Sequence, residues 1–138
     1  MYRCAIDEFE HRMYDLPRRT RAALCELWAD ISRKYMPWIR FSKDDLREGK
    51  CWPHQTHIVE VPFYYIEYDI AQISTWEFYM GMRNDRTRTL ENYMKRCRAG
   101  GSKSFRELLA IAGLSDPFAE GTVERICGPV AEELQSIL

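Results

Sequence analysis

The sequence lacks any long hydrophobic run and any excess of charge of one sign. No stretch reaches the roughly 18 consecutive apolar residues that suggest a membrane-spanning helix. Twenty lysines and arginines stand against twenty-one aspartates and glutamates, and the resulting net charge of -1 provides no positive field that would attract nucleic acid. We therefore expect neither a membrane nor a nucleic acid among the partners of this protein.

The sequence also lacks the features of a secreted protein. Its first segment, MYRCAIDEFEHRMY, carries charges throughout and has no apolar leader core or small-residue cleavage site. The five cysteines are an odd number, lie far apart and form no Cys-x-x-Cys pair, which argues against both a disulfide framework and a four-thiolate zinc site. We expect reduced thiols and a cytoplasmic location.

What the sequence does contain is helical periodicity, over a length that fits one domain spanning residues 1–138. The first helix starts at residue 1 without a cap, and its charged residues, Glu10 among them, are expected to turn away from the apolar face. That face is formed by Tyr2, Ile6, Phe9 and Met13. Pro17 suits the first turn of a second helix, whose apolar stripe is Leu24, Leu27, Trp28, Ile31 and Tyr35. Residues 36–56 are expected to be irregular, with one short turn after Ser42.

Further helices are predicted over residues 62–82 and 85–98, the first of them starting at Pro62. Ser104 and Glu107 form a capping box that opens another helix, and Gly113 stands where a left-handed C-terminal residue is expected. A last helix begins at Asp116 with Pro117. The pattern predicts an all-α bundle of about five or six helices.

The helix predicted over residues 62–82 is apolar nearly all round, and such a helix requires burial on every side. The other helices of a chain this short supply only part of that cover. We therefore expect the isolated chain to self-associate, because monomers rarely tolerate an apolar patch of more than a few hundred Å².

Several segments, in order and spacing, resemble one enzyme family. They are FEHRMY, CWPHQTHIVEVPFYYIEYDIAQ and LENYMKRCRAGGSKSFRELLAIAGLSDPF, followed by the helical tail. Together they resemble the C-terminal part of the oligoendopeptidase F family of zinc metallopeptidases, relatives of thimet oligopeptidase. The resemblance implies a large, mostly helical zincin-type peptidase domain that encloses a channel for an oligopeptide substrate.

The chain departs from that family in its metal-binding motif. The family holds zinc with the two histidines of a His-Glu-x-x-His helix and with a glutamate from the next helix. This chain contains only His11, His54 and His57, and no pair of them forms that motif. We therefore predict no metal ligands here. By the family's order, the metal-binding half lies before residue 1 or is carried by an N-terminal partner chain.

The resemblance implies that one histidine and several tyrosines form the part of the active site that this chain contains. It implies that His57, Tyr65 and Tyr68 are catalytic and that Tyr64 binds substrate. Donors of this kind stabilise the oxyanion that forms when water attacks a peptide carbonyl, and each is worth about 10²–10³-fold in rate. A helix through this segment would place Tyr65 and Tyr68 on one face and turn Tyr64 about 100° away.

Simpler interpretations compete with these assignments. Aromatic residues at helical spacing commonly pack in a core. Glu67 and Asp69 fit helix capping or a salt bridge to an arginine better than a catalytic pair. The spacing Cys51-x2-His54-x2-His57 leaves a soft-metal site conceivable. For the whole chain, the alternative to a split or truncated endopeptidase is a stand-alone helical peptide-binding or structural module without catalysis.

Overall fold

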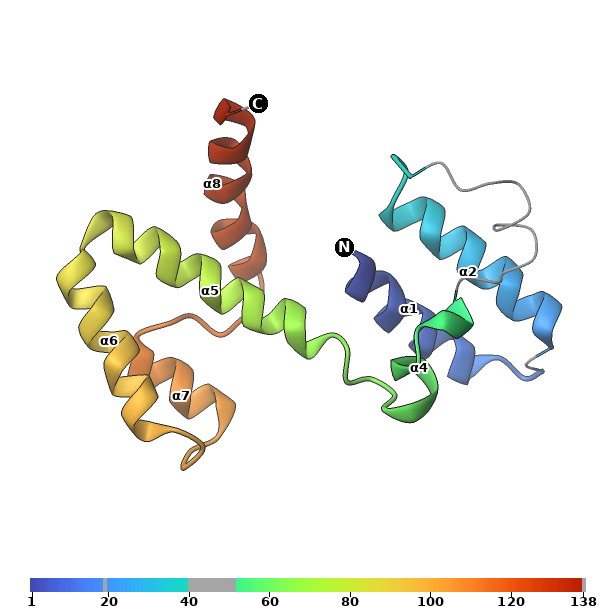
Figure 1. Ribbon diagram of the computed structural model, residues 1–138, viewed down its shortest axis with the longest axis horizontal. Coiled ribbons are helices and arrows are strands. Elements are labelled where there is room, and N and C mark those ends of the chain that lie inside the picture. Colours follow the sequence, from blue (N-terminus) through green and yellow to red (C-terminus); the bar gives the residue numbers. More distant parts are fainter. Residues whose placement is uncertain (19, 40–51, 138) are drawn as a thin grey trace. The chain divides into compact units, whose positions relative to one another are not determined.

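The structure is a computed structural model, and it describes residues 1–18, 20–39 and 52–137. Its internal contacts divide the chain into two compact units, an N-terminal unit of Met1–Asp69 and a C-terminal unit of Ile70–Leu138. All regular structure in the described residues is helical, which confirms the predicted all-α class (Figure 1). None of the helices in these residues is long and apolar enough to cross a membrane.

The N-terminal unit is built on two helices that lie side by side, α1 (Tyr2–Asp15) and α2 (Arg21–Tyr35) (Figure 1). Phe9 is fully buried between two indole rings, 5.3 Å from that of Trp28 and 5.4 Å from that of Trp52. The predicted apolar stripes supply most of this core, although Tyr2 of the first stripe is exposed. The core contains Ala5, Ile6, Phe9, Met13, Leu24, Leu27, Trp28, Ile31, Met36 and Ile58.

Two predictions about these helices are wrong. Pro17 lies in a bend before α2, and the helix begins after Thr20, whose Oγ1 accepts a hydrogen bond from the Ala23 backbone N–H at 3.3 Å. Glu10 does not turn away from the core, because only 1% of its surface is exposed. The short turn expected after Ser42 lies outside the described residues.

Two short pieces follow before the longest helix. A 3-10 turn covers Trp52–His54, and α4 covers His57–Glu60. Residues 57–60 form a helical turn, although the alternating apolar residues of HIVEVP would also suit a short extended piece. Ile58, the second residue of α4, packs in the core between α1 and α2 and is only 1% exposed. This packing attaches α4 to the core.

The helix predicted from Pro62 begins later, since α5 covers Glu67–Asn84. Phe63 takes a left-handed backbone conformation with φ 63°, which interrupts any helix through residues 61–66. None of the α5 residues is buried, so the apolar side chains on its several sides are only half covered in this structure.

The C-terminal unit contains most of α5 with α6 (Arg86–Ala99), α7 (Phe105–Ala112) and α8 (Thr122–Ile137). The Ser104–Glu107 capping box and the left-handed Gly113, φ 66°, are both present as predicted. The last helix starts later than predicted, at Thr122. Glu133 of α8 accepts hydrogen bonds from Tyr79 and Arg83, which ties α8 to α5.

Candidate active site

The four residues that the sequence singles out lie on α4, on the turn that follows it, and at the start of α5. His57 is the first residue of α4 and is half-buried. Tyr64 and Tyr65 lie in the turn, and Tyr68 is the second residue of α5. Tyr65 and Tyr68 therefore do not share a helix face as expected, because the left-handed Phe63 ends helical continuity before them.

The four rings nevertheless lie close together, because the turn between α4 and α5 folds the tyrosines back toward His57. The His57 ring lies 4.6 Å from that of Tyr65 and stacks at 6.4 Å on that of Tyr64. Tyr68 meets both tyrosines edge to face, at 5.7 Å from Tyr64 and 5.8 Å from Tyr65. We call these four residues the His57–tyrosine cluster. Tyr64 and Tyr68 are exposed, at 41% and 45%, so the cluster opens to solvent.

Polar neighbours of His57 and Tyr64 influence where the protons of these two side chains lie. Gln55 Nε2 contacts His57 Nδ1. An amide NH2 can only donate, so this contact assigns the proton of a neutral imidazole to Nε2. A hydrogen bond with Tyr68 is the main cause that raises the pKa of Tyr64, which keeps that phenol protonated beyond its ordinary range.

Arg3, which the sequence analysis did not identify as a site residue, lies against the cluster. The Arg3 guanidinium stands 5.9 Å from the ring centre of Tyr65 and 5.5 Å from that of Tyr68. Its Nη1 donates to Asp69 Oδ1 at 2.9 Å, while the Cys4 thiol donates to the other Asp69 oxygen at 3.1 Å. This confirms the salt-bridge interpretation of Asp69. No local pattern could have identified Arg3, because it lies 66 residues from its partner.

A second residue missed from the sequence is Glu10, on the core-facing side of α1. Burial is the main cause that raises the pKa of its carboxyl group, and the backbone N–H of Phe63 acts in the opposite direction. Within the described residues, neither carboxylate oxygen has a hydrogen bond of ordinary geometry. The helical period could have identified it, because position 10 follows Ile6 by four residues and so lies on the same apolar face.

The described residues contain no group of three histidine, cysteine or acidic side chains placed to hold a metal ion. Cys51, one member of the conceivable soft-metal set, lies outside the described residues.

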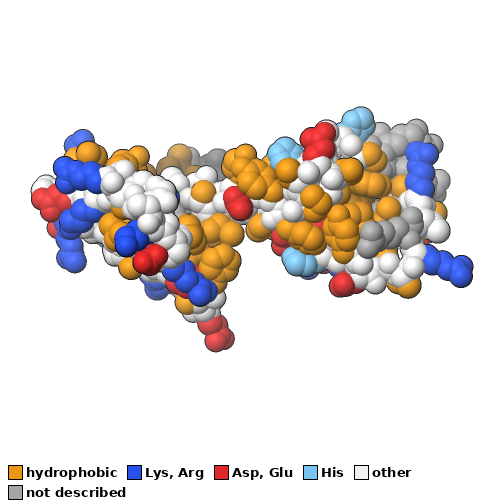
Figure 2. All heavy atoms as spheres, turned by 90° about the horizontal axis from the view of Figure 1, so that it is seen from below, with side chains coloured by type: hydrophobic (Ala, Val, Ile, Leu, Met, Phe, Trp, Pro, Cys, Tyr) orange, Lys and Arg blue, Asp and Glu red, His pale blue; other side chains and the backbone are white. Residues whose placement is uncertain are grey.

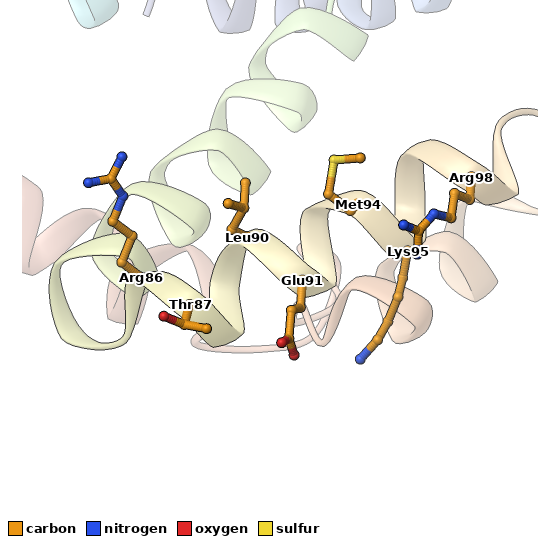
Figure 3. Close-up of a pocket in the computed structure, with 7 residues that line it drawn as sticks. All are labelled: Arg86, Thr87, Leu90, Glu91, Met94, Lys95 and Arg98. Atoms are coloured by element: carbon orange, nitrogen blue, oxygen red, sulfur yellow. The ribbon is translucent and has the colours of Figure 1, made fainter.

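A shallow hollow elsewhere is formed by one helix alone. It is lined by Arg86, Thr87, Leu90, Glu91, Met94, Lys95 and Arg98, all of them on α6. Leu90 and Met94 project to one side of the helix and Glu91 to the other (Figure 3). None of the residues that the family resemblance assigns to catalysis lies there. The basic side chains of α6 form a solvated helix face, since no residue of this helix is buried.

The chain is similar in sequence to one peptidase family. A model of peptidase family M3 matches residues 1–127. An oligoendopeptidase F homologue of Borreliella burgdorferi is 27% identical over 124 residues, which are 85% of this chain and 20% of that protein.

Solved structures extend the similarity to the fold. A structure described as oligoendopeptidase F is 38% identical with a TM-score of 0.89, over 98% of this chain and 24% of its own. PZ peptidase A with an inhibitor is 39% identical with the same TM-score and the same coverage. An oligoendopeptidase F from Bacillus anthracis is 32% identical, with a TM-score of 0.74, over 98% of this chain and 21% of its own. This chain thus spans about a fifth to a quarter of the length of these proteins.

The raised pKa of Glu10 predicts a pH-dependent loss of stability. Its contribution to folding is most favourable while the carboxyl is protonated, below the ordinary value of about 4.3, and declines as the pH rises through the raised folded-state pKa. The charged groups that act on it are Asp7, His11 and His57. Glu10→Gln should therefore stabilise the chain at pH 7, by on the order of 1 kcal/mol, and give little gain near pH 4.

Urea unfolding at both pH values measures this difference. Glu26→Gln, at an exposed position of α2, is the matched control and should change stability little at either pH. A Glu10→Gln gain that is equal at the two pH values would contradict the assignment.

Proposed function

Because this chain belongs to peptidase family M3, we propose that it is the C-terminal portion of an oligoendopeptidase F-like zinc metalloendopeptidase and carries the substrate-binding and oxyanion-stabilising part of its active site. The observation that supports this most is the His57–tyrosine cluster. One imidazole and three phenols form four ring contacts, with centres 4.6 to 6.4 Å apart, along a segment of only twelve residues.

The donors of this cluster suit a developing negative charge. His57 presents Nε2–H because Gln55 occupies Nδ1, and Tyr64 and Tyr68 are exposed phenols that can donate to a bound peptide. Preorganised donors aimed at the oxygen of a tetrahedral intermediate lower the barrier because they need no reorganisation during the reaction. The guanidinium of Arg3 adds a fixed positive charge beside Tyr65 and Tyr68.

The roles that follow for this chain are hydrogen bonding and orientation. His57 and Tyr68 donate to the carbonyl oxygen that becomes the oxyanion, Tyr65 supports the imidazole by ring contact, and Tyr64 orients Tyr68 and contacts the peptide. The sequence contains no His-Glu-x-x-His motif, so the proposal assigns metal binding to a different polypeptide segment.

A peptide analogue with an anionic tetrahedral group tests this function directly. A short phosphinic peptide should bind the metal-free chain more tightly than the matching amide peptide, since its charged oxygens mimic the intermediate. Tyr68→Phe should lower affinity for the phosphinic peptide about tenfold, as expected for a lost charge-assisted hydrogen bond, and leave the amide peptide less affected. Isothermal titration calorimetry provides both affinities.

Tyr79→Phe is the matched control for this experiment. Tyr79 is equally exposed, at 45%, but lies in the C-terminal unit, where its hydroxyl donates to Glu133. Equal binding of the two peptides, with no effect of Tyr68→Phe, would reject oxyanion stabilisation and favour a peptide-binding module without catalysis.

We also predict that the chain alone does not hydrolyse peptides. The family's metal motif is missing from the sequence, and the described residues offer no substitute set of ligands. Quenched fluorescent peptides incubated with the chain and added zinc should show no turnover above background. Turnover that a chelator abolishes would refute this prediction.

Self-association is the remaining proposal. Apolar side chains gather on the face of the N-terminal unit that Figure 2 shows, beside its histidines. In the same unit Val59 is 73% exposed and Trp38 is 63% exposed, while no residue of α5 is buried. At micromolar concentration we expect a dimer or larger oligomer, because association covers this apolar surface. Light scattering that gives a monomer mass, together with a cooperative melt, would argue against it.

A further inference from the structure

The first turn of α1 lies against two tyrosines of the cluster. Tyr2 meets the ring of Tyr65 edge to face, with 6.4 Å between the ring centres. The guanidinium of Arg3 lies 5.9 Å from the ring centre of Tyr65 and 5.5 Å from that of Tyr68. Both distances are within the roughly 6 Å over which a cation is attracted to the face of an aromatic ring. Two consecutive residues of α1 thus contact the cluster.

Asp69 fixes the place of this guanidinium. Arg3 Nη1 donates to Asp69 Oδ1 at 2.9 Å, and the Cys4 thiol donates to Asp69 Oδ2 at 3.1 Å. Both oxygens of the carboxylate are therefore held by the first turn of α1. Asp69 follows Tyr68 directly in α5. The same guanidinium consequently contacts the ring of Tyr68 and pairs with the carboxylate of the next residue.

Neither stability nor charge alone accounts for this arrangement. The Arg3 side chain is 39% exposed, and ion pairs open to solvent add little to the free energy of unfolding. A positive charge near the phenols would require no particular orientation. A planar guanidinium can pair with a carboxylate and stack on aromatic rings at the same time, whereas the compact ammonium of a lysine cannot stack in this way. The set of contacts therefore depends on arginine itself.

We propose that Arg3 is a positioning residue of the His57–tyrosine cluster. Its guanidinium, held by Asp69, keeps the ring of Tyr65 against His57 and the ring of Tyr68 against Tyr65. The consequence for peptide binding rests on the proposed function, whereas the placement of the rings does not.

Two substitutions separate positioning from the other roles open to Arg3. Arg3→Lys keeps the positive charge and a donor for Asp69 but lacks the planar guanidinium. Arg3→Met removes the charge as well and keeps an unbranched side chain. A role as a nearby charge predicts that lysine serves as well as arginine. A positioning role predicts that both variants release the tyrosine rings.

Proton NMR of the full chain measures the placement of the rings. In both Arg3 variants we expect loss of the nuclear Overhauser contacts between the rings of His57 and Tyr65 and between those of Tyr65 and Tyr68. The helix content, measured by circular dichroism, should stay native, because the ion pair adds little to stability.

Arg12→Met is the matched control. Arg12 lies on the same helix and pairs with Glu8 of that helix, with 3.6 Å between Nη1 and Oε1. Its substitution removes an arginine and an ion pair from α1 and should leave both ring contacts native. Loss of the ring contacts in this variant too would show a general effect of α1 and would overturn the proposal.

The phosphinic peptide gives a second measurement. Its affinity should fall about tenfold in Arg3→Lys, although the net charge is unchanged, because the donors are no longer held in place. A role as a nearby charge predicts native affinity in this variant. Isothermal titration calorimetry distinguishes the two.

The ring contacts decide the proposal, and the native chain decides the proposed function. Native ring contacts in either Arg3 variant would overturn the positioning role, and if Arg3→Met does not fold, Arg3→Lys decides. Should the native chain show no preference for the phosphinic peptide while Arg3→Lys loses the ring contacts, the proposed function fails and the positioning role stands.

Discussion

Burial of Ile58 in the core between α1 and α2 is the contact on which the geometry of the site depends. Full burial of an isoleucine stabilises a fold by about 1.5–3 kcal/mol, and here it also fixes α4, a helix of only four residues that could not persist alone. His57 is the neighbour of Ile58, so the core of α1 and α2 directly determines where the imidazole lies.

The remaining members of the cluster are placed by the turn between α4 and α5. At its far end, Asp69 is joined to Arg3 of α1, so the start of α5 is tied back to the first turn of α1. Because the Arg3 side chain is partly exposed to solvent, this ion pair adds little to the free energy of unfolding. Its importance is positional, because the same guanidinium lies against the rings of Tyr65 and Tyr68.

The site therefore combines stable support with groups that oppose stability. Phe63 in a left-handed conformation and Glu10 as a buried carboxylate both raise the free energy of the fold. Phe63 lies in the turn that presents the tyrosines, and its ring packs against that of His11, the residue that follows Glu10 in α1. The packing of Ile58, Phe9 and Trp28 in the same unit compensates for both. Chains that concentrate unfavourable features in one place commonly do so where chemistry or binding takes place.

The sequence by itself determined the helical class, the apolar stripes of α1 and α2, the Ser104–Glu107 capping box and the left-handed Gly113, because periodicity and capping act over a few neighbouring residues. It also identified His57 and the three tyrosines, although their roles remain proposals. Only the tertiary structure decided that α5 begins at Glu67, that Arg3 reaches Asp69 across 66 positions, and that Glu10 is buried. These features arise from contacts between segments distant in the chain, and local propensity carries no information about such contacts.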